Sequence, residues 1–113
     1  MKIKTNELTD AALDWAVALA DNHDEGWLHR QIKNPNPDTR AIPHYSTDWS
    51  QGGPIIEREK ITPYAPVPGD PNWSAFYAQT PGTSYGPTPL IAAMRCYVAS
   101  KLGDEVDVPK ELT

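Results

Sequence analysis

Hydrophobic side chains recur at helical spacing in the last third of the chain. Between Leu90 and Leu102 apolar positions follow one another every three or four residues, which is typical of a helix with one buried face. Thr88 precedes this segment as a good N-cap, Pro89 takes the first helical position, and Gly103 follows as a stop signal. The pattern therefore predicts that this segment is the core helix.

A second helix is predicted near the N-terminus, from a cap at Thr9 to about Asn22. Its body is apolar on nearly every side, and its only polar stripe consists of Asp10, Asp14 and Asp21. Such a helix is mostly buried and keeps its polar stripe in water. We therefore expect the three aspartates to form a solvated face rather than a metal site.

Short strands are expected around these helices. The predicted strands are Lys2–Lys4, Ile55–Ile61 and Asn72–Ala78, the last with Trp73, Ala75 and Tyr77 on one face. Residues 22–44 are expected to connect elements, with a short strand or one helical turn at 26–32. The segment 79–84 is expected to be a loop, and residues after 103 either a last strand or an arm that grips a neighbouring subunit.

The order of these elements predicts an α+β fold, because helices and strands do not alternate as in βαβ units. We expect two main helices packed on a small antiparallel sheet, with long Pro-rich irregular loops. The length of 113 residues indicates a single domain, residues 1–113. Twelve prolines are about twice the usual ~5% share, and all but Pro109 lie between Pro35 and Pro89. The aromatic residues of the same region argue for an ordered fold and against disorder.

Composition excludes several classes of protein. The net charge is −5 and the ten Lys and Arg residues are scattered, which argues against binding to duplex nucleic acid. No apolar window approaches the ~20 residues of a membrane span, and no signal peptide is evident. We therefore expect a cytosolic protein without membrane contact. The single cysteine, Cys96, excludes an internal disulfide and lies on the core helix.

No catalytic motif is found, so we expect neither enzymatic activity nor a cofactor. A nucleophile elbow, a zinc-protease motif, a P-loop and a dinucleotide fingerprint are all missing from the sequence. His23, His29 and His44 do not have metal-ligand spacing, so no metal site is predicted. Glu57 and Glu59 would share a face of the predicted strand, where we interpret them as ordinary exposed charges.

The entry to the core helix is the first candidate binding site. Tyr85, Gly86 and Thr88 precede a helix whose positive end offers free amides, a typical anion site. Arg95 follows two turns later, and Arg58 could supply a second guanidinium. The alternative is that the prolines here only stiffen the helix entry.

The segment Tyr45–Ile61 is the second candidate. This segment could form one wall of a pocket. Its hydroxyls come from Ser46 and Thr47, its indole from Trp49, and its exposed backbone from Gly52 and Gly53. The alternative is a turn anchored by a buried Trp49.

Three segments carry a resemblance to a known family. Residues Leu13–Ala18, Tyr45–Glu59 and Gly86–Val106 are similar to the NinX-like proteins, which tailed bacteriophages and prophages of enteric bacteria encode. The similarity spans essentially the whole chain and is weakest in the middle loops. It implies a small accessory protein that acts in the cytoplasm of an infected bacterium, and it transfers no catalytic residues.

Two functions follow as hypotheses. In the first, the protein is a non-enzymatic binder that sequesters a small nucleotide-derived host molecule, such as a defence signal. Trp49 and Tyr85 would then stack on the base, Arg58 and Arg95 would balance charge, and phosphate or ribose would meet Gly52, Gly53, Gly86 and Thr88. In the alternative, the protein is an inhibitor or adaptor that binds a host enzyme. A homo-oligomer is also expected, because two largely apolar helices need covering.

Overall fold

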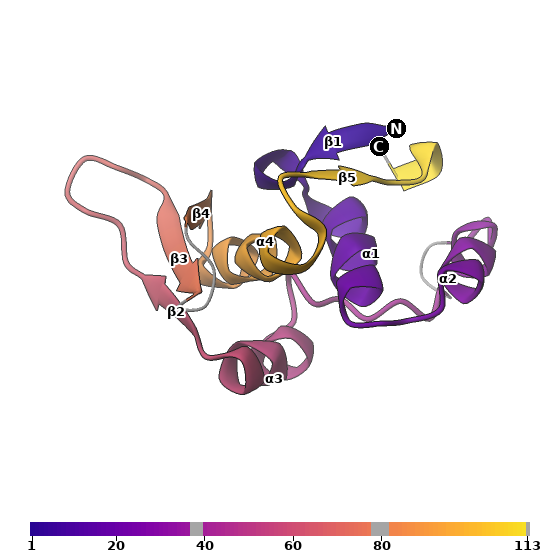
Figure 1. Ribbon diagram of the computed structural model, residues 1–113, viewed down its shortest axis with the longest axis horizontal. Helices are drawn as coiled ribbons and strands as arrows, with labels where there is room; N and C mark the ends of the chain where they lie inside the picture. The colour runs from indigo at the N-terminus through magenta and orange to yellow at the C-terminus, as the bar shows by residue number, and fades with distance from the viewer. Residues whose placement is uncertain (37–39, 78–81, 113) are drawn as a thin grey trace.

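The computed structural model describes residues 1–36, 40–77 and 82–112 and shows the predicted α+β class (Figure 1). The helices of the described ranges are α1 (Asp10–Ala20), α2 (Glu25–Ile32), α3 (Trp49–Glu59) and α4 (Pro89–Leu102). One antiparallel sheet has the strand order β2 (Ile61–Tyr64), β3 (Trp73–Tyr77) and β4 (Thr83–Gly86). A second pairs β1 (Lys2–Lys4) with β5 (Glu105–Asp107), and single turns of 3₁₀-helix follow at Thr5–Glu7 (η1) and Lys110–Leu112 (η3).

Helix α4 is the centre of the fold, as the sequence predicts. Thr88 caps it by accepting a hydrogen bond from the Ile91 amide at 3.1 Å, and Gly103 ends it with a φ of +90°. The helix packs against one face of the β2–β3–β4 sheet and also contacts α1 and α3 (Figure 1). Met94 and Val98 are fully buried. Because one chain already covers both α1 and α4, the original reason for expecting an oligomer no longer holds.

Helix α1 corrects one prediction about its polar stripe. Asp10 is exposed, but Asp14 is buried, with 6% of its surface exposed. The reason is tertiary, because the segment that precedes α3 packs over this side of α1 and donates the Ser46 amide to Asp14 at 2.8 Å. Asp21, the residue just after the helix, forms an ion pair with Arg58.

The predicted strand at Ile55–Ile61 is wrong, because residues 49–59 form helix α3. Asp48 caps this helix by accepting a hydrogen bond from the Ser50 amide at 2.9 Å. Gly52 and Ile55 are its buried positions, three residues apart, so the helix buries one stripe against its neighbours. As a result Glu57 and Glu59 do not share a strand face. Packing here outweighs the low helix propensity of two glycines and Pro54.

The remaining elements agree with the predictions in part. Strand β1 is an edge strand, as expected. Of the two alternatives for the residues after 103, the structure shows the strand, because β5 pairs with β1. Strand β3 directs Ala75 and Tyr77 inward, as expected, with Trp73 partly buried on the same face. The segment 26–32 belongs to the two-turn helix α2, and residues 83–84 belong to β4 where a loop was expected. Residues 79–81 of that expected loop lie outside the described residues.

Within the described ranges, no helix has the length and apolar character needed to cross a membrane.

Candidate functional site

The predicted site residues fall into three places, and the first is the entry to α4. Pro89 has no amide hydrogen, Ile91 donates to the Thr88 hydroxyl, and the Ala92 amide donates to the Thr88 carbonyl at 3.0 Å. Of the first-turn amides, that of Leu90 has no hydrogen-bond partner among the described residues, but Leu90 itself is only 2% exposed. Gly86 is buried, and a Cβ at this position would come within 2.9 Å of the Ala92 nitrogen. The entry is therefore tightly packed and offers little to an anion.

Arg95, which was expected to balance the charge of a ligand, is a buried residue that bonds to the backbone of two other segments. It is 7% exposed, and its Nε donates to the Leu8 carbonyl at 3.0 Å. Its Nη1 donates to the Tyr85 carbonyl at 2.7 Å, which ties α4 to β4. Burial lowers the pKa of this guanidinium. Arg95 thus holds the backbone of the candidate site rather than facing a ligand.

The second place is the start of α3, which lies beside the start of α4. A Cβ on Gly52 would lie 2.3 Å from the Tyr45 carbonyl oxygen and 2.8 Å from Leu90 Cδ1, so two backbones and a core side chain meet at this glycine. Trp49 is 53% exposed, so the alternative of a buried Trp49 anchor is wrong. Of the two hydroxyls that precede the helix, Ser46 is buried and Thr47 is exposed.

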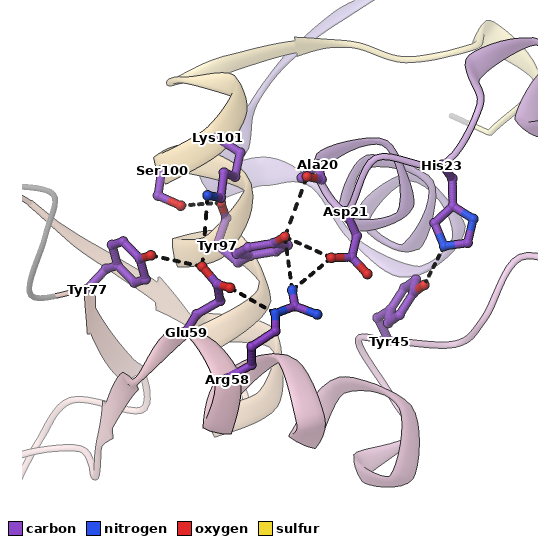
Figure 2. Close-up of polar contacts among 10 residues, drawn as sticks. All are labelled: Ala20, Asp21, His23, Tyr45, Arg58, Glu59, Tyr77, Tyr97, Ser100 and Lys101. Atoms are coloured by element: carbon purple, nitrogen blue, oxygen red, sulfur yellow. Dashed lines mark hydrogen bonds and ion pairs between the residues drawn. The ribbon is translucent and has the colours of Figure 1, made fainter.

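The third place is a polar network around Arg58, at the far end of α3 (Figure 2). The Arg58 guanidinium lies 2.8 Å from Asp21 Oδ1 and 2.9 Å from Glu59 Oε2. It also donates to the Tyr97 hydroxyl at 3.2 Å. Tyr77 donates to the other oxygen of Glu59 at 2.9 Å. Two carboxylates already balance the charge of Arg58, which makes it a weak receptor for a further anion.

The same network sets the protonation of its members. Hydrogen bonds from Arg58 and Tyr77 hold the pKa of Glu59 below its usual value. Burial and the hydrogen bond to Asp21 raise the pKa of Tyr97. Glu59 is therefore a stable carboxylate and Tyr97 a protonated phenol, and neither is poised for proton transfer near neutral pH. The arrangement joins α1, α3, β3 and α4 and has the features of a structural network.

An aromatic outer face on the β2–β3–β4 sheet was missed by the sequence analysis. Cross-strand pairing places Ser74 between Tyr64 and Tyr85, with Phe76 one step further along β3 on the same face. These three aromatic side chains are 53%, 49% and 38% exposed, and α4 covers only the opposite face (Figure 1). None of the three strands carries a charged residue. Reading the exposed positions of each strand for aromatic residues would have found this face.

Two hollows share only a few lining residues with these places. The larger, about 440 Å³, lies between η1, β4 and α4 and is lined in part by Glu7, Tyr77 and Cys96. Burial raises the pKa of Cys96 to about 11, so this thiol is not an activated nucleophile. The smaller, about 260 Å³, includes Thr47 among its lining residues. Among the described residues, no group of three or more His, Cys, Asp and Glu side chains could hold a metal ion.

The comparison with protein families gives one match. The profile of a family described as Bacteriophage P22, NinX matches residues 4–101, a range that runs from the last residue of β1 to the next-to-last residue of α4 and leaves out β5 and η3. Among curated proteins, none matches the chain.

Proposed function

Because this chain belongs to the bacteriophage P22 NinX family, we propose that it is a phage accessory protein that binds a host protein through the aromatic outer face of its sheet. Binding rather than catalysis is the function proposed, and the cytoplasm of the infected bacterium is the proposed setting. The proposal adopts the second of the two hypotheses from the sequence.

The exposed aromatic face carries this proposal. Soluble proteins rarely leave a contiguous apolar patch in water, and tyrosine and phenylalanine are enriched where proteins meet. Tyr64, Phe76 and Tyr85 lie on adjacent strands, so their rings can contact one partner surface together. The strands contribute hydroxyls but no charge. The partner that fits is an uncharged, largely apolar protein patch that forms a few hydrogen bonds at its edge.

A charge placed on this face tests the proposal. Phe76→Lys should abolish binding, because a lysine in the centre of an apolar interface would have to be desolvated without a partner. Trp49→Lys is the matched control, since it makes the same change at an exposed aromatic residue of α3. Tagged wild-type protein and both variants are incubated with host lysate, and recovered proteins are identified by mass spectrometry. Circular dichroism confirms that both variants fold.

The expected result is one host protein that is recovered stoichiometrically by wild type and Trp49→Lys and lost with Phe76→Lys. Retention of the same partner by Phe76→Lys would contradict the proposal. So would light scattering that shows a wild-type dimer and a Phe76→Lys monomer, because the face would then join two copies of this chain. The same measurement tests the expected homo-oligomer.

Sequestration of a small nucleotide-derived molecule is our second candidate. Trp49 and Tyr85 support this candidate, because both are exposed and available for stacking. Thermal-shift measurements with cyclic and ADP-ribose-type nucleotides test it. A ligand should raise the melting temperature of wild type and Phe76→Lys but not of Trp49→Lys. The two variants thus separate the two candidates, and no shift with any nucleotide would exclude the second.

A further inference from the structure

The smaller hollow lies away from the β2–β3–β4 sheet, at a place where four parts of the chain meet. Helix α1, the end of α2, residues 40–47 and the C-terminal turn enclose about 260 Å³. Its apolar walls are formed by Ala11, Ile32, Ile42 and Leu112. Apolar walls around a few polar groups are typical of small-molecule sites.

Asp14 is the buried charge in this hollow. Its side chain is 8% exposed, and Oδ1 accepts the Ser46 amide at 2.8 Å. Oδ2 lies 3.8 Å from His44 Nδ1, which is longer than a hydrogen bond. Oδ2 is not among the sealed, unpartnered atoms of the described residues, and Asp14 lines the hollow, so a ligand that supplies a donor can reach this oxygen. Burial also raises the pKa of Asp14.

The other charged groups around the hollow compensate Asp14 only weakly. Arg40 donates to the Ile32 carbonyl at 3.1 Å and twice to the Asn34 carbonyl, so its charge lies at the negative end of α2. His44 is exposed, and its Nδ1 is 3.8 Å from Asp14 Oδ2, too far for a hydrogen bond. Asp10 adds a second negative charge at the rim. The charges around the hollow therefore favour the binding of a cation over an anion.

We propose that this hollow binds a small organic cation, a primary ammonium group on an aliphatic body, with Asp14 as its counter-ion. The ammonium would donate to Asp14 Oδ2, and the aliphatic body would contact the isoleucines and Leu112. This site is separate from the sheet face, so the inference does not depend on the proposed host partner.

Titration with 3-methylbutylamine tests the proposal. Binding is followed by calorimetry and by amide shifts in nitrogen–proton NMR spectra at pH 8, where an aliphatic amine is protonated. The uncharged analogue 3-methylbutan-1-ol has nearly the same shape. Asp14→Asn keeps an acceptor for the Ser46 amide while it removes the charge and replaces Oδ2 by an amide nitrogen, and Asp107→Asn is the control at an exposed aspartate. Nα-acetyl-lysine amide shows whether the same ammonium can arrive on a protein side chain.

We expect saturable amine binding with shifts at Ala11 and Ser46, unchanged by Asp107→Asn and weakened about tenfold or more by Asp14→Asn. Weaker binding of the lysine derivative identifies a free amine as the ligand, and equal binding identifies a lysine side chain; both support an ammonium site. Equal affinity for the alcohol, no effect of Asp14→Asn, or no binding of any amine would overturn the proposal. Because Asp14→Asn is measured by NMR, an unfolded variant is recognised at once, and Ile42→Ala then serves as the second variant.

Discussion

At the residue scale, burial decides which side chains can react. Cys96 is 5% exposed within α4, and burial raises the pKa of its thiol to about 11. Asp14 is also buried and also has a raised pKa, and both residues line a hollow. The difference between them is therefore chemical, because a protonated thiol does not react, whereas a carboxylate oxygen can accept a hydrogen bond from a ligand.

Cys96 should be nearly inert toward thiol reagents in the folded protein. A pKa raised from 9.0 to about 11 lowers the thiolate fraction at pH 8 by about 100-fold, and the thiolate is the reacting species. Ellman's reagent should therefore label the native protein at least about 100-fold more slowly than the protein in guanidinium chloride. Equal rates in the two states would show that α4 does not shield this thiol.

At the element scale, two adjacent glycines of α3 have opposite roles. Gly52 lies against the Tyr45 backbone and Leu90, where no Cβ fits. Gly53 has only the Trp49 ring nearby, at 3.8 Å from an added Cβ. The close approach of α3 to the start of α4 depends on the first glycine and not on the second.

Gly52→Ala should destabilise the protein although alanine favours helices. The new methyl group would overlap backbone atoms that cannot move independently, at a cost of about 1–3 kcal/mol. Gly53→Ala is the matched control, and its free energy of unfolding should stay unchanged or rise by up to about 1 kcal/mol. Urea denaturation followed by circular dichroism measures both. If Gly52→Ala proves as stable as Gly53→Ala, the two helices do not approach as closely as described.

At the scale of the whole molecule, the network around Glu59 connects the sheet to the helices. Its carboxylate contacts Arg58, Tyr77 and, at 3.9 Å, Lys101, so one residue links α3, β3 and α4 (Figure 2). These contacts lower the pKa of Glu59 in the folded state. A lowered pKa means that the contribution to stability is present above the unfolded-state value and is lost as the pH falls through the folded-state value.

Glu59→Gln should reduce the sensitivity of the protein to acid. At pH 7 the variant should lose about 1 kcal/mol of unfolding free energy, because its ion pair with Arg58 and its charge-assisted bond from Tyr77 are gone. At pH 3 the difference from wild type should be smaller than at pH 7, because an unfolded-state glutamate is largely protonated there and the stabilisation falls with pH. Urea denaturation at both pH values measures this, and Glu57→Gln, at an exposed position of the same helix, is the control. A difference that stays constant with pH would assign the effect to packing instead of charge.

The sequence alone determined the parts of the fold whose signals are local. The cap at Thr88, the spacing of apolar residues after it and the stop at Gly103 specify α4 within its own segment, and strand β3 shows its alternation in the same way. Segment 49–59 was misread because its glycines, Pro54 and spaced isoleucines resemble a turn and a strand. The close packing of Gly52 against Tyr45 and Leu90 is a tertiary feature that the local pattern does not show.

The candidate sites were decided by tertiary structure. From the sequence, Arg95 was predicted to bind a ligand. In the structure its guanidinium donates to the carbonyls of Leu8 and Tyr85, which lie 87 and 10 positions away in the chain. Asp14 is buried by a segment more than thirty residues away, through a bond to Ser46 with a separation of 32 positions. The aromatic face exists only because β2, β3 and β4 pair in one register. Spacing in sequence specifies hydrogen bonds and side-chain faces within one element, whereas the partners of a side chain depend on which elements pack together.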